Sequence, residues 1–127
     1  MRVAAGLGCR RGVPARAVRD LLEQAAARAG VAPTLLAIPD FKHDEPGLVE
    51  AARGAGLALL RISPAELRAQ QPRCVTRSAR VRSATGVDSV AEACALAATA
   101  PGGRLVLPRI TAQGVTCAIA VADNGAP

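Results

Sequence analysis

The sequence predicts one α/β domain, built as a mixed sheet of about five strands with helices on both faces and an antiparallel hairpin at the C-terminal end. Three observations predict this fold. Apolar runs alternate with helical patterns through the first half of the chain, and only a short loop containing Gly114 separates the last two apolar runs. The 127 residues contain no linker or internal repeat, so residues 1–127 are expected to form a single domain.

The chain opens with a strand–helix–strand unit. Residues 3–8 are typical of a buried strand, and apolar residues then recur at helical spacing from Val18 until Gly30 ends the helix. Pro14 suits the first turn of that helix. Residues 34–38 form the second strand. Such a unit normally joins two parallel strands, so the turns that follow them are expected at the same edge of the sheet.

The middle of the chain contains shorter elements. A short helix ends near residues 54–56, and residues 57–62 form a third strand. Ser63 and Glu66 have the spacing of a capping box, which predicts a second short helix. Residues 71–85 are irregular in pattern and rich in arginine, and we expect them to be mostly loop.

A second capping box, formed by Ser89 and Glu92, begins a helix that is almost wholly apolar until residues 101–103 end it. That composition predicts a helix buried on most sides. Residues 104–109 and 115–121 then form the two strands of the hairpin.

Composition and charge limit the classes of ligand that the protein is expected to bind. The formal net charge is +6, and residues 73–87 include four arginines but no acidic residue. This stretch either attracts an anionic ligand or is a solvated basic face. Nucleic-acid binding is not expected, because Phe41 is the only large aromatic residue and stacking platforms are absent.

The cysteines predict neither a metal site nor a dense disulfide framework. They are widely spread, without a CxxC pair, and His43 is the only histidine; the four are Cys9, Cys74, Cys94 and Cys117. We therefore expect no metal and no cofactor. Arg10 and Arg11 interrupt the first apolar run before a signal peptide would be complete, and no apolar stretch approaches the roughly 20 residues of a membrane span. These features predict a cytoplasmic protein with reduced cysteines and no membrane contact.

The first candidate site is the segment GLGCRRG, residues 6–12. It lies between a predicted strand and a helix N-terminus, where backbone amides and the helix dipole favour anions. It matches neither the dinucleotide fingerprint nor the P-loop. The glycines equally suit a tight turn. Cys9 has neighbours that favour a thiolate, but the segment offers no obvious base to activate a nucleophile.

The second candidate site is residues 40–45, in the turn after the second strand, where open α/β sheets place their ligands. Asp44 suits a helix N-cap and Glu45 a favourable first-turn acid, whereas Lys42 has no comparable local role.

The sequence does not decide whether two further residues bind ligand. Glu92 is explained by capping, and Thr116 is either a sheet-face hydroxyl or a ligand contact.

Four segments resemble, in order, the motifs of the CobE and CbiG C-terminal family. They are GLGCRRG at 6–12, DFKHDEPGL at 40–48, TGVDSVAEACAL at 85–96 and VTCAIA at 115–120, and they span nearly the whole chain. Arg109 stands where this family usually has a lysine. The resemblance implies an α/β sheet fold and a role in corrin-ring assembly during cobalamin (vitamin B12) biosynthesis.

The resemblance implies two functions. In the first, the protein binds a corrin-ring intermediate, a precorrin or a hydrogenobyrinic-acid-like compound, as a carrier or as an accessory to other cobalamin-pathway enzymes. In the second, it is a small hydrolase acting on a precorrin lactone or side chain, because CbiG opens such a lactone. Binding is favoured, since no set of base, nucleophile and orienting residue is recognisable, and arginines recognise carboxylates well. The expected ligand contacts are Gly6, Gly8, Cys9, Arg10, Arg11, Gly12, Lys42, Asp44, Glu45, Glu92 and Thr116.

Overall fold

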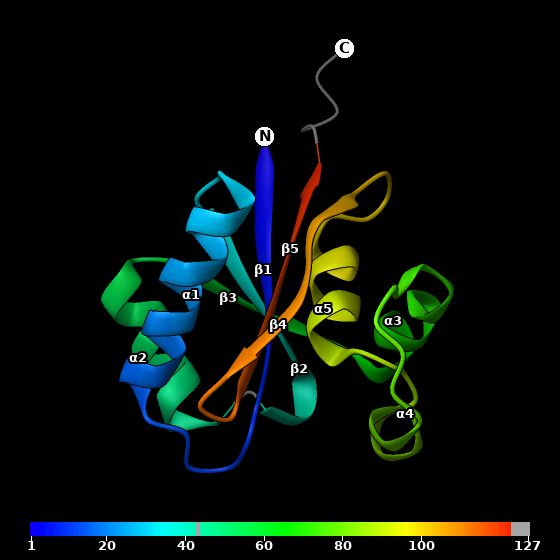
Figure 1. Cartoon of the computed structure of the whole chain (residues 1–127), viewed down its shortest axis with the longest axis horizontal. Coiled ribbons are helices and arrows are strands. Elements are labelled where there is room, and N and C mark those ends of the chain that lie inside the picture. Colours follow the sequence, from blue (N-terminus) through cyan, green and yellow to red (C-terminus); the bar gives the residue numbers. More distant parts are fainter. Residues whose placement is uncertain (43, 123–127) are drawn as a thin grey trace.

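A computed structural model of the chain describes residues 1–42 and 44–122. Within these ranges five strands form one mixed sheet in the order β3–β2–β1–β5–β4 (Figure 1). The strands are β1 (Arg2–Cys9), β2 (Leu35–Pro39), β3 (Ala58–Ile62), β4 (Arg104–Ala112) and β5 (Val115–Ala122). β1 and β3 both run parallel to β2, whereas β5 runs antiparallel to β1 and to β4. The predicted mixed sheet and its C-terminal hairpin are confirmed.

Helices cover both faces of this sheet, as predicted (Figure 1). α1 and α2 lie on one face, and α5 lies on the other with α3 beyond it. The helices are α1 (Ala15–Ala29), α2 (Pro46–Ala55), α3 (Pro64–Ala69), α4 (Ala79–Thr85) and α5 (Val90–Ala98), with short 3₁₀ turns at Asp40–Lys42 and Gln71–Arg73. No helix in the described ranges is long and apolar enough to cross a membrane.

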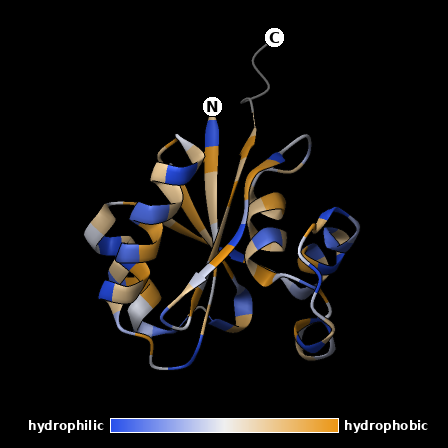
Figure 2. Ribbon diagram, viewed as in Figure 1, coloured by the Kyte–Doolittle hydropathy of each residue, from blue (hydrophilic) through white to orange (hydrophobic). Residues whose placement is uncertain are grey.

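The two faces of the sheet are packed differently. Alternate residues of β1, such as Val3 and Leu7, belong to the larger core cluster beneath α1 and α2, whereas Ala4 belongs to the cluster beneath α5. Figure 2 shows the difference, because α1 mixes hydrophilic and hydrophobic residues whereas α5 is mainly hydrophobic. α5 lies almost directly on the sheet: a Cβ atom at Gly6 would be only 1.9 Å from the Ala91 carbonyl oxygen. Small residues on β1 therefore allow the predicted burial of α5.

The prediction that residues 71–85 are mostly loop is wrong. The segment contains the 3₁₀ turn at Gln71–Arg73 and the helix α4. Ser78 caps α4 by accepting a hydrogen bond from the Val81 amide, and Gly86, with a φ of 88°, ends it. α4 has no buried residue, so it lacks the apolar stripe by which helices are recognised in a sequence.

Candidate functional site

A cleft of about 580 Å³ opens at the edge of the sheet where β1 and β2 end. The two parallel strands bring Gly8 and Lys42 to the same cleft, although 34 residues separate them in sequence. The shared cleft expected for the turns after these strands is therefore observed. The lining residues are Gly8, Cys9, Arg10, Pro39, Phe41, Lys42, Ser78, Arg80, Val81, Thr85, Val90, Arg109, Thr111, Gly114 and Thr116.

The chemistry of the lining is cationic and apolar. Among the described residues, the lining includes four cations and no carboxylate. Hydroxyl groups come from β4, β5 and α4, and the cross-strand neighbours Thr111 and Thr116 supply two of them. Apolar side chains, including those of Phe41 and Val90, complete the surface. Such a cleft suits an anion that also has apolar area to bury. The cations are Arg10, Lys42, Arg80 and Arg109.

Arg10 is positioned by the hairpin turn between β4 and β5. Its backbone amide donates to the Gly114 carbonyl at 2.9 Å, which extends the pairing of β1 with β5. Its guanidinium lies against the same glycine, because a Cβ atom there would be 2.4 Å from the Arg10 Nε. Gly114 also has a φ of 81°, which favours glycine. One glycine thus makes the turn and gives room to a cleft arginine.

Lys42 has a local partner, contrary to the expectation from the sequence. Its Nζ lies 3.9 Å from Oε1 of Glu45, and Oε2 of Glu45 accepts a hydrogen bond from the Gly12 amide at 3.1 Å. Glu45 is buried and occupies the N-cap position of α2, without a side-chain capping bond. The prediction that Asp44 caps this helix is therefore wrong. Glu45 ties the loop after β1 to the start of α2, beside Lys42.

The proposed anion site formed by backbone amides at residues 6–12 is not supported. β1 continues to Cys9, so Gly6 and Gly8 lie within the sheet, paired with Ala118 and Thr116 of β5. The Gly12 amide already donates to Glu45. Gly6 is buried beneath α5, and Arg11 and Gly12 line a smaller neighbouring cavity of about 170 Å³. Side chains, rather than these amides, present the positive charge in the cleft.

Asp44 lies outside the main cleft. It is exposed and lines an adjoining cavity of about 400 Å³, together with Arg11, Lys42 and Glu45. Of the residues predicted to bind ligand, the main cleft brings together Gly8, Cys9, Arg10, Lys42 and Thr116.

Cys9 lines the cleft but does not have the thiolate character suggested by its neighbours in sequence. Burial raises the pKa of the Cys9 thiol; nearby Lys42 lowers it and Glu45 raises it further. The sequence argument placed the thiol at a helix start, whereas Cys9 is the last residue of β1 and packs against the core beneath α1. An uncharged thiol at this position is a poor nucleophile.

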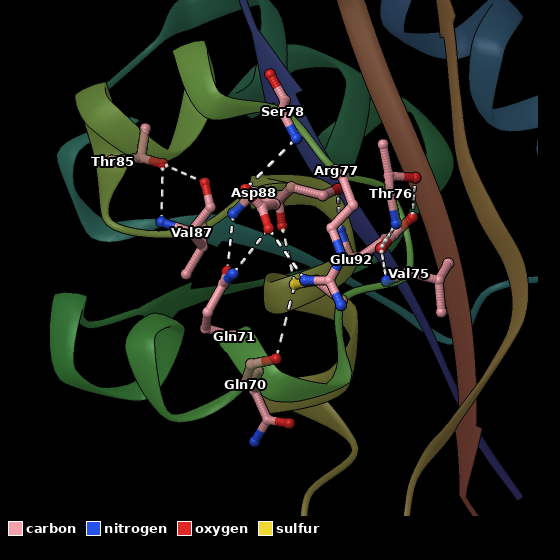
Figure 3. Close-up of polar contacts among 12 residues, drawn as sticks. Gln70, Gln71, Val75, Thr76, Arg77, Ser78, Thr85, Val87, Asp88 and Glu92 are labelled. Carbon is pink, nitrogen blue, oxygen red and sulfur yellow. Dashed lines mark hydrogen bonds and ion pairs between the residues drawn. The ribbon is translucent and has the colours of Figure 1, made fainter.

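Glu92 is fully buried on α5 and does not line the cleft. Its Oε1 accepts hydrogen bonds from the amides of Val75 (2.8 Å) and Thr76 (3.1 Å), as Figure 3 shows. Its Oε2 accepts from the Thr76 hydroxyl (2.5 Å) and the Arg109 amide (2.9 Å). Burial alone would raise the pKa of Glu92, but these hydrogen bonds outweigh it and lower the pKa.

The capping box predicted at Ser89 is therefore only half formed. The Ser89 hydroxyl accepts from the Glu92 amide at 3.2 Å, but the Glu92 carboxylate has other partners. The sequence explanation of Glu92 as a capping residue is incomplete, and its expected contact with ligand is not seen in the lining of the cleft.

The arginine-rich stretch is anchored by a second buried acid, Asp88, just before α5. Asp88 accepts hydrogen bonds from the Gln71 side chain at 2.8 Å and from Arg77 at 3.1 Å (Figure 3). The hydrogen bond from Gln71, followed by that from Arg77, lowers the pKa of Asp88. Arg73 instead donates to the Gly103 carbonyl. The stretch appeared unpaired in the sequence because its acidic partner lies outside it.

The sequence analysis did not single out two of the cleft cations. Arg80 was one of several arginines in the basic stretch, and only the fold separates it from Arg77, which pairs with Asp88. Arg109 was known only as a replacement of a family lysine. A usable signal was present, because Arg109 and Thr111 alternate on β4 and so share one face of the hairpin.

No three histidine, cysteine, aspartate or glutamate side chains within residues 1–42 and 44–122 are grouped so that they could hold a metal ion. The cleft lining described above likewise offers no set of metal ligands.

Comparison with known proteins gives consistent matches. The family described as "Cobalamin synthesis G C-terminus" matches residues 3–120. The chain is 36% identical over 118 residues to Protein CobE of Sinorhizobium sp., covering 91% of this chain and 77% of that protein.

Two crystal structures are also similar. The first is that of CobE, a protein from the cobalamin (vitamin B12) biosynthetic pathway, with a TM-score of 0.87, 34% identity and coverage of 94% of this chain and 89% of that one. The second is that of cobalamin biosynthesis protein chiG from Agrobacterium tumefaciens str. C58, with a TM-score of 0.78, 38% identity and coverage of 96% and 99%.

Proposed function

The chain belongs to the CobE/CbiG C-terminal family of cobalamin biosynthesis, and from this premise we propose that it binds a corrin-ring intermediate in the cleft at the ends of β1 and β2. The ligand is a precorrin or a hydrogenobyrinic-acid-like compound. The protein acts as a carrier or accessory to other enzymes of the pathway.

The observation that carries this proposal is the lining of the cleft, which combines four cations with apolar side chains and, in the part of the chain described, no carboxylate. Corrin intermediates have an apolar ring bordered by acetate and propionate carboxylates. Arginine binds a carboxylate through two parallel hydrogen bonds, and no carboxylate among the described lining residues competes with the ligand for these cations. The cleft therefore complements both the ring and its acidic substituents.

The cations come from four separate segments, which suits a ligand with several carboxylates. Arg10 follows β1 and Lys42 follows β2, whereas Arg80 lies on α4 and Arg109 on β4. A single small anion would need only one or two of these groups. A ring with carboxylates on several sides can contact them together.

The lining favours binding over hydrolysis. It offers no carboxylate among its described residues to act as a base, and burial raises the pKa of the Cys9 thiol, which weakens it as a nucleophile. We nevertheless treat turnover as a measurable outcome of the binding experiment.

The test is an absorbance titration of the protein with hydrogenobyrinic acid, in parallel with the same ring after its side-chain carboxylates have been converted to amides. We expect micromolar binding of the acid, weaker binding at higher salt because the charges are screened, and weak or no binding of the amide. Equal affinity for both compounds, or no effect of salt, contradicts an electrostatic site. Recovery of the ligand with unchanged mass supports binding alone, whereas a changed mass supports hydrolysis.

Two arginines of α4 provide a matched pair of variants. Arg80 and Arg82 are both exposed and each contributes one positive charge, but only Arg80 lines the cleft. We expect Arg80→Ala to weaken binding by roughly tenfold, the scale of one hydrogen bond to a charged group, and Arg82→Ala to leave it nearly unchanged. Equal losses in both variants would mean that only the overall charge matters.

A further inference from the structure

We propose that Glu92 is a positioning residue of this cleft, whose buried carboxylate holds two of the four cations, Arg109 and Arg80, in place for the ligand. The inference rests on the proposed function, because it concerns the same cleft. Glu92 does not itself line the cleft, so it acts through the backbone segments to which it is hydrogen-bonded.

The first of these segments is an irregular part of β4. The pairing with β5 shifts between Leu107, opposite Ile119, and Ile110, opposite Cys117, so that two residues of β4 stand where β5 has one. Those two are Pro108, which has no amide hydrogen, and Arg109, whose amide donates to Glu92 at 2.9 Å. Such bulges change the direction of a side chain, and here the side chain is that of a cleft cation.

The second segment leads into α4. Glu92 accepts hydrogen bonds from the amides of Val75 and Thr76 and from the Thr76 hydroxyl (Figure 3). Two residues later, Ser78 caps α4, which carries the cleft residue Arg80. Because α4 has no buried residue of its own, its position depends on the segments that flank it, and the hydrogen bonds to Glu92 fix one of them.

The other two cleft cations are held by contacts that do not involve Glu92. Arg10 lies against Gly114, and Lys42 pairs with Glu45. α5 packs tightly on β1, as the close approach at Gly6 shows. The position of Glu92 on this helix is therefore fixed independently of its hydrogen-bond partners. Loss of its carboxylate should therefore disturb Arg109 and Arg80 while leaving Arg10 and Lys42 in place.

Double-mutant cycles with hydrogenobyrinic acid test this division. In Glu92→Gln the NH₂ group replaces one carboxylate oxygen and faces backbone N–H donors, either those of Val75 and Thr76 or that of Arg109, so the contacts to β4 and to residues 75–76 cannot all persist. We expect Glu92→Gln to weaken binding by roughly tenfold in the native chain and in Arg10→Ala, and by a smaller factor in Arg109→Ala. In the Arg80→Ala/Arg109→Ala variant, which lacks both groups through which Glu92 acts, the loss should be less than about twofold.

The outcomes distinguish failure of the inference from failure of the proposed function. An equal loss in the Arg10→Ala and Arg109→Ala backgrounds means that Glu92 has only a general structural role and overturns the inference. No binding by the native chain overturns the proposed function instead. In that case the ¹H–¹⁵N resonance of the Arg109 amide still decides whether Glu92 holds this residue, since the resonance should shift in Glu92→Gln and should not shift in Glu50→Gln, an exposed residue of α2.

A milder variant covers the event that Glu92→Gln does not fold. Thr76→Val removes one hydroxyl donor and leaves the carboxylate, its amide partners and α5 intact. It should weaken binding in the native chain and in Arg10→Ala, but not in Arg80→Ala. The same loss in every background would overturn the α4 half of the inference.

Discussion

At the scale of single residues, Lys42 both contacts Glu45 and lines the cleft. Its ammonium group lies 3.9 Å from Glu45, a long contact at a partly exposed side chain, so the pair contributes little to stability. Three arginines line the cleft with Lys42, and the described lining includes no carboxylate. We expect Lys42→Ala to weaken ligand binding by roughly 1.5 to 3 kcal/mol and to change the free energy of unfolding by less than about 0.5 kcal/mol.

The measurement is the absorbance titration combined with thermal unfolding. Arg28→Ala, at the exposed end of α1, removes the same charge far from the lining residues and serves as the control. If both variants bind as the native chain does, Lys42 is not a ligand contact.

Cys9 and Gly8 both line the cleft, but we expect substitutions at the two residues to have different effects on ligand binding. Burial raises the pKa of the thiol, so we expect Cys9→Ser to retain both binding and fold. Gly8→Val should weaken binding, because even its Cβ atom would lie 2.7 Å from the Thr116 hydroxyl on the cleft surface. Titrations of the two folded variants decide this, and loss of function in Cys9→Ser alone would favour a nucleophilic role.

At the scale of elements, the packing of α5 on β1 depends more on Gly6 than on Gly8. A Cβ atom at Gly6 would lie 1.9 Å from the Ala91 carbonyl oxygen and 2.6 Å from the Ala95 amide, both helix backbone atoms that cannot move alone. At Gly8 the obstacle is the end of the Thr116 side chain, which can rotate. We expect Gly6→Ala to lower the free energy of unfolding by about 3 kcal/mol or more, and Gly8→Ala by less than about 1 kcal/mol.

Denaturant unfolding of both variants measures the difference. The pair is matched, since each change adds one methyl group to β1 on the face that α5 covers. Similar stabilities for the two proteins would mean that α5 does not lie as close to the strand as the structure indicates.

At the scale of the whole molecule, two buried carboxylates fasten residues 71–78 to α5 and should make the fold sensitive to acid. Hydrogen bonds lower the pKa values of Asp88 and Glu92 in the folded state. The stability they contribute is therefore complete above the ordinary carboxyl pKa, about 4, and is lost as the pH falls through the lowered folded values.

Thermal unfolding between about pH 3 and pH 7 tests this dependence. We expect the melting temperature to fall with acid, and the slope of unfolding free energy against pH to be smaller in Glu92→Gln than in the native chain. Glu50→Gln, which changes an exposed carboxylate on α2, should keep the native slope. A native slope in Glu92→Gln would show that the buried carboxylate is not the group responsible.

The sequence by itself determined the sheet, its hairpin, the burial of α5 and the family. These features follow from local patterns: the apolar runs of β1 and β2, the helical spacing around Val18, and the small turn at Gly114. It also predicted that Lys42 and Gly8 share a cleft, because parallel strands end at the same edge of a sheet.

Only the tertiary structure decided how the charged residues are used. Asp88 and Glu92 lie outside the arginine-rich stretch that they anchor, and Glu45 takes the Gly12 amide that seemed free for an anion. Short-range patterns cannot show such pairings, since a carboxylate selects its donors by distance in space. For the same reason, only the fold selects Arg80 from among the arginines of residues 73–82 as a group that lines the cleft.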